Sequence, residues 1–170
     1  MTPEHYEERV RRREALKFLR EAALSGLAFY SGKTWVANGE QIFTDRITAF
    51  RFSKGHHIDN LPEVIPDADC PVSDCYSKHF EAVKYTTAET PLKQSSLELA
   101  IEKWEAKGKP AYVCTYTVGV ACYNAIRLLE ALRILGVDEA VIKQCQAREP
   151  AHIVTDGRVA IIAPYNEETG

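Results

Sequence analysis

ACYNAIRLLEALRILGVDEAVIKQCQAREPAHIVTDGRVAIIAPY, residues 121–165, contains the clearest signals for secondary structure in this chain. Asn124 begins a predicted helix, because its side-chain oxygen can accept hydrogen bonds from the unpaired N–H groups of the first turn. Apolar side chains then recur with helical spacing, at Ile126, Leu128, Leu129, Leu132 and Leu135. Gly136 supplies the left-handed residue that commonly follows a helix, so we expect the helix to cover residues 124–135.

Short strands are expected after this helix. Residues 140–142 (AVI) and 151–154 (AHIV) have strand character. Between Val154 and Val159, the dipeptide Asp156-Gly157 is a strong hairpin signal, because tight hairpin turns need residues that tolerate positive φ. The segment is therefore predicted to form one helix followed by three strands (α-βββ).

The beginning of the chain has the same order. A helix is predicted over residues 4–24, with Pro3 in its first turn and Gly26 at its end. Its expected buried face consists of Val10, Ala15, Leu16, Phe18, Leu19, Ala22 and Ala23. Short strands joined by tight turns follow, over residues 27–30, 34–37 and 41–52. The chain thus contains two α-βββ units about 100 residues apart, which indicates an internal duplication.

The second unit resembles the final repeat of the bacterial DNA sliding clamp, the processivity ring of the replicative polymerase. That repeat similarly joins an asparagine-led Leu/Ala helix to strands and a P-A-x-I…D-G…P ending. The phrase VANGEQIFTDRITAFRF, residues 36–52, resembles the V-A-T-D-G-x-R-L-A strand–turn–strand of clamp repeats. The resemblance implies an α+β fold, a DNA-clamp-like domain built from two α-βββ repeats, with the helices on one face of antiparallel sheets.

The length of 170 residues suits one domain, residues 1–170. Repeat one is expected over about 4–52 and repeat two over about 111–165, where residues 110–120 supply a strand before the second helix. A connector over about 53–110 separates them, with a Pro-rich acidic loop and an extra helix over about 93–107, capped by Ser95 or Ser96. That helix is either an insertion or peripheral packing for the sheet.

Composition excludes several classes of protein. The sequence contains no apolar run long enough to predict a membrane span. The N-terminus, MTPEHYEERVRRREALKF, is too charged to resemble a signal peptide, so we expect a cytoplasmic protein. The formal net charge of −3 does not decide whether DNA is bound, because the distribution of charge matters more than its sum.

The five cysteines include no CxxC pair, which favours reduced thiols. Cys114, Cys122 and Cys145 are expected to be small core hydrophobes. Only Cys70, Cys75 and His79, expected on one loop with His56 and His57, suggest a metal, and their spacing is weak evidence for zinc. We therefore expect no metal and no cofactor, and the role of this loop stays open.

A basic stripe runs along the first helix. Arg9, Arg13, Lys17 and Arg20 follow one another at gaps of four, four and three residues, with Arg11 and Arg12 beside them. This stripe is either a solvated face paired with Glu14 and Glu21 or a surface that contacts the phosphates of double-stranded DNA without reading its sequence. The second interpretation also needs Arg127 and Arg133 of the second helix on the same face.

Three functions remain open. The first is a non-enzymatic sliding-clamp-like scaffold or processivity-type factor in replication or repair, assembled as a homo-oligomer on DNA. The second is an interaction module with the clamp fold that does not encircle DNA and binds replication or phage proteins. Its groove would be formed by Ile161, Ala163, Pro164 and Tyr165, although the run 163–166 and the polar residues 167–170 lack the Met-Pro-Met-Arg-Leu-like tail of true clamps. The third is a small enzyme or metal protein using the Cys70/Cys75/His79 loop.

Overall fold

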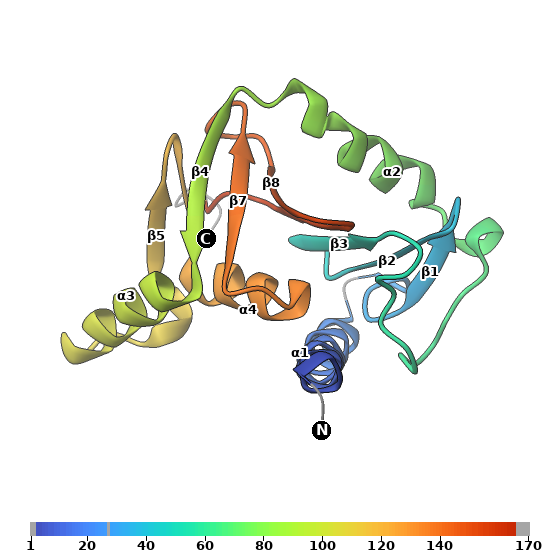
Figure 1. Ribbon diagram of the computed structural model, residues 1–170, viewed down its shortest axis with the longest axis horizontal. Coiled ribbons are helices and arrows are strands. Elements are labelled where there is room, and N and C mark those ends of the chain that lie inside the picture. Colours follow the sequence, from blue (N-terminus) through green and yellow to red (C-terminus); the bar gives the residue numbers. More distant parts are fainter. Residues whose placement is uncertain (1–2, 27, 166–170) are drawn as a thin grey trace.

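A computed structural model describes residues 3–26 and 28–165. Its helices are α1 (Pro3–Ser25), α2 (Ser73–Glu81), α3 (Gln94–Ala106) and α4 (Ala125–Leu135), with short 3-10 helices η1 (Asp67–Asp69), η2 (Ala82–Tyr85) and η3 (Ala111–Val113). Its strands are β1 (Thr34–Ala37), β2 (Glu40–Thr44), β3 (Thr48–Phe52), β4 (Ala88–Lys93), β5 (Thr115–Val118), β6 (Ala121–Asn124), β7 (Glu139–Gln144), β8 (Ala151–Thr155) and β9 (Arg158–Ile162). The fold is α+β, as predicted (Figure 1).

One antiparallel sheet joins the two units. Its seven strands have the order β1-β2-β3-β9-β8-β7-β4, and β5 pairs only with β6 in a separate hairpin. β3 and β9 pair antiparallel at the junction, with Phe50 opposite Ala160. The three strands of the second unit therefore continue the sheet in the reverse order of the first three, as a pseudo-twofold axis between β3 and β9 requires. The predicted pair of α-βββ repeats is confirmed.

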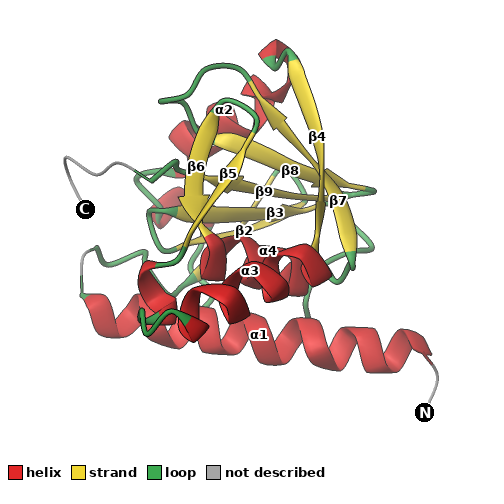
Figure 2. Cartoon of the chain, turned by 90° about the vertical axis from the view of Figure 1, so that its left-hand side faces the viewer, coloured by secondary structure: helices red, strands yellow, loops and turns green. Residues whose placement is uncertain are grey.

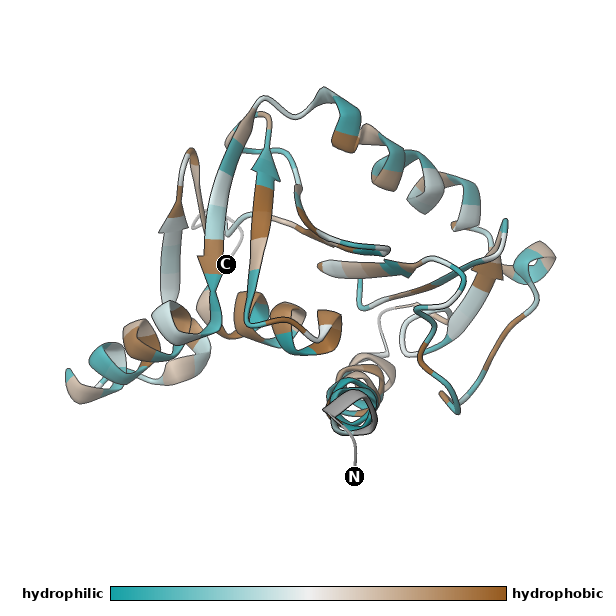
Figure 3. Cartoon of the chain, viewed as in Figure 1, coloured by the Kyte–Doolittle hydropathy of each residue, from teal (hydrophilic) through white to brown (hydrophobic). Residues whose placement is uncertain are grey.

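The helices of the two units pack side by side on one face of this sheet, which also confirms the prediction. Figure 2 shows α1 and α4 beneath the strands, with α3 beside α4. Phe18 of α1 and Leu128 of α4 belong to the same core as Phe50 and are at most 2% exposed. In Figure 3 the hydrophobic colours gather on α4 and β7. Burial of this apolar surface is the main force that holds the helices to the sheet.

The local signals of α4 act as the sequence predicts. The Asn124 side chain accepts a hydrogen bond from the backbone N–H of Arg127 at 3.1 Å. Gly136 follows the helix with φ of 76°, and its N–H donates to Leu132 O at 2.9 Å. The turn at Asp156-Gly157 joins β8 to β9 as a hairpin. Both ends of the second unit's helix are thus set by local sequence.

The buried face of α1 is narrower than predicted. Leu16 is 38% exposed and Ala23 is also exposed. Arg11, expected beside the basic stripe, is only 3% exposed, because its Nε donates to Ile134 O at 2.9 Å and its Nη2 to His56 O at 3.1 Å. Its guanidinium also lies 4.7 Å from the Phe52 ring centroid. Arg11 therefore ties α1 to the C-terminal end of α4.

The connector differs most from its prediction. α2 occupies the expected loop around Cys75 and His79 and covers the other face of the sheet (Figure 1). Beneath it, Phe80 packs in a second core whose other buried members are Trp35, Ala37, Ile42, Ala49, Cys70 and Ile161. This core is the physical reason for the helix, since the sheet has an apolar second face to bury.

Four further segments differ from their predictions. β4 was not predicted because it contains Pro91, which is tolerated here since β4 is an edge strand. α3 begins at Gln94 without a side-chain cap, so neither Ser95 nor Ser96 acts as one. Within the predicted strand over 110–120, residues 111–113 form η3 and residues 115–118 form the strand β5, which pairs with β6. Of the predicted strand 27–30, residue 27 lies outside the described residues, residue 28 has no regular structure and residues 29–30 lie in a turn.

Candidate nucleic-acid interface

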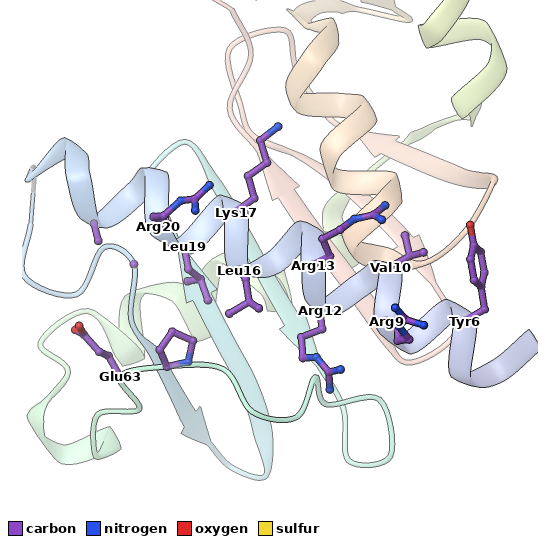
Figure 4. A pocket seen from close by; sticks show the side chains of 13 residues that line it. Tyr6, Arg9, Val10, Arg12, Arg13, Leu16, Lys17, Leu19, Arg20 and Glu63 are labelled. Atoms are coloured by element: carbon purple, nitrogen blue, oxygen red, sulfur yellow. The ribbon is translucent and has the colours of Figure 1, made fainter. Parts of the chain in front are cut away.

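A groove of about 910 Å³ runs along α1, on the part of the helix that the sheet does not cover. Figure 4 shows the side chains around it. Most come from α1, and the opposite wall is made by the turn at Gly32 and by Pro62 and Glu63. The residues from α1 are Tyr6, Arg9, Val10, Arg12, Arg13, Leu16, Lys17, Leu19, Arg20 and Ala23.

All four cations of the predicted stripe line this groove. Arg9, Arg13, Lys17 and Arg20 are exposed. Arg12, which the sequence places beside the stripe, lines the groove as well. Arg13 lies 3.6 Å from Glu14, but its side chain is 73% exposed, so the pair is screened by water. The structure therefore brings five cations together around one hollow. An evenly spaced set of cations on a helix can neutralise several phosphates without contacting bases.

The structure does not place Arg127 with this stripe. Its Nη1 lies 2.5 Å from Asp45 Oδ2, and the other oxygen of Asp45 accepts the N–H groups of Ile47 and Thr48 at 2.9 and 2.8 Å. Arg127 lines a separate hollow of about 280 Å³ between α1 and α4, together with Glu21 and Glu130. Its guanidinium thus ties α4 to the turn between β2 and β3.

Arg133 lies closer to the stripe. It lines a third hollow, of about 620 Å³, with Arg13 and Glu14 of α1. Its Nη2 is 3.8 Å from Glu98 of α3, and its side chain is 39% exposed. Of the two predicted cations on α4, the structure therefore brings one near Arg13 and holds the other in a half-buried ion pair.

Sequence reasoning missed one titratable group at this surface. The pKa of Glu130 is raised from its ordinary value of 4.5 to about 7, chiefly by burial and also by the neighbouring carboxylates Asp45 and Glu21, against the opposing effects of Arg127 and Lys17. A glutamate within an amphipathic helix gives no sequence signal for this. Its burial results from the packing of α1 against α4, which only the tertiary structure shows.

The predicted partner groove divides into two parts. Ile161 and Ala163 line a hollow of about 280 Å³ beneath α2, which Ile47, Tyr76 and other side chains complete. Pro164 and Tyr165 do not line it, and the N–H of Tyr165 donates to Cys122 O of β6 at 2.7 Å. Residues 166–170 of the expected tail lie outside the described residues.

Within residues 3–26 and 28–165, no three His, Cys, Asp or Glu side chains form a group that could hold a metal ion. Cys70 is buried in the core under α2, whereas Cys75 and His79 lie one turn apart on that helix. The carbonyl oxygen of His79 lies within hydrogen-bonding distance, 2.8 Å, of Nε2 of the buried His152. The helices in the described part of the chain are too short or too polar to cross a bilayer.

Solved DNA sliding clamps have a similar structure. The Helicobacter pylori beta clamp, crystallised with a DNA ligase peptide, matches over 75% of this chain and 40% of its own, with 15% identity and a TM-score of 0.40. A putative DNA polymerase III beta subunit of Eubacterium rectale matches over 75% and 41%, with 11% identity and a TM-score of 0.39. The Bacillus subtilis DNA polymerase sliding clamp matches over 75% and 41%, with 10% identity and a TM-score of 0.36.

The chain thus spans 40–41% of the length of these clamps. The likeness concerns the fold alone. No protein-family model matches the sequence, and no curated protein matches it.

Proposed function

We propose that this chain is a non-enzymatic, clamp-like scaffold that associates with double-stranded DNA through α1. The proposed contacts are Arg9, Arg13, Lys17 and Arg20, which would reach backbone phosphates and read no bases. The observation that carries the proposal is that these four cations line one continuous groove. A scaffold that holds a duplex regardless of its sequence suits a processivity-type role in replication or repair.

Binding of this kind has a recognisable signature. Release of counterions from the phosphates supplies its free energy, so the affinity should be weak, independent of sequence and strongly dependent on salt. The test is to titrate the purified protein with labelled duplexes of unrelated sequence, at low and at near-physiological salt. Absence of duplex binding even at low salt would refute the proposal.

The decisive variant combines Arg13→Glu with Lys17→Glu. Both positions are exposed on α1, so the change should leave the fold intact while it reverses the charge of the groove. The matched control combines Lys78→Glu with Lys84→Glu. These exposed lysines lie on α2 and η2, beyond the other face of the sheet. The first double variant should abolish duplex binding and the second should retain it, because only the first changes the proposed surface.

Assembly and location belong to the same proposal. A scaffold that retains DNA topologically must surround it, so we expect a homo-oligomer in the cytoplasm. Light scattering on the purified chain, with and without duplex, measures the number of copies. A protein that stays monomeric in the presence of DNA would limit the proposal to a scaffold without a ring.

A second candidate function is an interaction module that does not encircle DNA. The hollow lined by Ile161 and Ala163 favours it, because its apolar walls suit a short segment of a replication or phage protein. Ala163→Arg would fill this hollow with a charge. If this function holds, the variant should lose partners that the wild type and the Lys78→Glu/Lys84→Glu control retain, and its duplex affinity should be unchanged.

A further inference from the structure

An acidic stripe runs along α1 beside the basic one. Glu7, Glu14 and Glu21 are seven residues apart, which is close to two helical turns and places all three on the same side of the helix. Each lies near the second unit. Glu7 pairs with Arg158 at 2.7 Å, Glu14 shares a hollow with Arg133, and Glu21 shares one with Arg127. The stripe therefore faces α4.

The seam between α1 and α4 carries more acid than base. Three carboxylates, those of Glu21, Asp45 and Glu130, line its hollow together with one guanidinium, that of Arg127. Asp45 already pairs with this guanidinium at 2.5 Å. When Glu21 and Glu130 are both ionised, they repel any phosphate that approaches the seam. Repulsion between like charges near a partly buried site is screened less than at an open surface.

On the opposite side of α1, the lining of the groove contains one acidic residue, and Glu8 and Asp59 lie with Arg12 in a small hollow beside it. Arg12 is half-buried there, and Figure 4 shows it directed, like Leu16, toward the segment that carries Pro62 and Glu63. Glu63 is the acidic residue in this lining, and its carboxylate lies 3.9 Å from Lys33. Its charge is thereby offset by a neighbouring cation.

We propose that the DNA backbone lies on the side of α1 that faces the 62–63 segment, contacts Arg12 in addition to the four-residue stripe, and is kept off α4 by the acidic seam. This inference rests on the proposed DNA association and specifies the side of α1 on which the DNA lies. Arg12 becomes a binding residue. Glu21 and Glu130 become residues that confine the phosphates, and Arg127 and Arg133 have structural roles in their ion pairs.

Three sets of variants test this direction with a labelled duplex at low and near-physiological salt. Arg12→Gln should weaken binding about fivefold and lower the slope of affinity against salt by about one, because one phosphate contact is lost. Arg127→Gln and Arg133→Gln should each leave the affinity within about twofold of wild type. At pH 8, where Glu130 is ionised, Glu21→Gln combined with Glu130→Gln should strengthen binding about two- to fivefold, because the repulsion is removed.

The outcomes separate the two proposals. If the wild type binds DNA but Arg133→Gln weakens binding as much as Arg12→Gln, the duplex crosses α4 and the inference is wrong while the proposed function stands. If the wild type binds no duplex at low salt, the proposed function is wrong and the inference falls with it. Arg133→Gln guards against misfolding of Arg127→Gln, because its ion pair with Glu98 is more exposed. Thermal unfolding of each variant confirms that the fold is retained.

Discussion

The helices α1 and α4 hold equivalent places in two units with the same element order, yet their surfaces differ. α4 has 11 residues, and seven of them are buried. α1 has 23 residues and carries exposed cations along much of its length. A duplicated fold therefore assigns different tasks to its copies. α4 fills the core between α1 and α3, while α1 covers the sheet with one side and exposes another to solvent.

The arginines of the two helices show this division. On α4, Arg127 and Arg133 are held by Asp45 and Glu98. On α1, Arg11 is buried against the end of α4, whereas its neighbours Arg12 and Arg13 line the groove. A difference of one position along a helix rotates a side chain by about 100°, which decides between a structural and a surface role.

The largest expected effect lies in the core of α4. Leu132→Ala should lower the free energy of unfolding by about 4 kcal/mol, because Leu132 is fully buried and its truncation leaves a cavity. The matched variant on α1 is Leu16→Ala, where the side chain is 38% exposed and the loss should stay below about 1 kcal/mol. Urea denaturation of both measures the difference. Equal losses would contradict the division between the helices.

Arg11→Met should cost about 3 kcal/mol, because the carbonyls of Ile134 and His56 lose a buried donor. Methionine keeps much of the side-chain volume, so the loss reports the guanidinium and not a cavity. Arg13→Met, on the exposed side of the same helix, should change stability by less than about 0.5 kcal/mol. Chemical denaturation at neutral pH compares the two. If Arg13→Met costs as much as Arg11→Met, the two arginines do not differ in role.

Much of the fold could be predicted because its signals are local. Asn124 and Gly136 set the ends of α4, and Asp156-Gly157 sets a hairpin, each through its own backbone and side-chain chemistry. Arg11 could not be separated from Arg12 and Arg13, because its burial depends on the end of α4, which lies 123 residues away in sequence. Periodicity places a residue on one side of a helix, but tertiary packing decides what covers that side.

The structure of the connector was harder to predict from the sequence for a similar reason. α2 forms over the second face of the sheet, where Phe80 finds Trp35 and Ile161, and these partners lie far from it in the sequence. Pro91 concealed β4, because a proline is compatible only with an edge strand and the sequence does not show which strands are edges. At the candidate site, the spacing of the four stripe cations in the sequence predicted that they share one face of α1. The seam around Glu130 could not be predicted, because it depends on how α1 packs against α4.

Glu130→Gln should raise the free energy of unfolding at high pH. The pKa of Glu130 is raised from 4.5 to about 7 in the folded chain, chiefly by burial. The folded chain therefore holds a proton that the unfolded chain releases between these values, so stability falls as pH rises through this window. The variant should gain about 2 kcal/mol at pH 8 and little at pH 5. Glu102→Gln, at an exposed position of α3 outside the hollow that Glu130 lines, is the control. A gain independent of pH would contradict the titration.

The smallest effect should come from the first turn of α4. Asn124→Ala should cost about 1 kcal/mol, because the N–H of Arg127 loses its acceptor. Asn124 Nδ2 also donates to Tyr112 O at 2.8 Å, so the alanine variant removes two contacts. Asn124→Asp separates them, since aspartate retains the acceptor, favours the helix N-terminus and loses only the donor. The aspartate variant should therefore unfold nearer to wild type than the alanine variant in thermal melts. If both variants lose the same stability, the hydrogen bond from Asn124 to Tyr112 of η3, and not the cap, sets the start of α4.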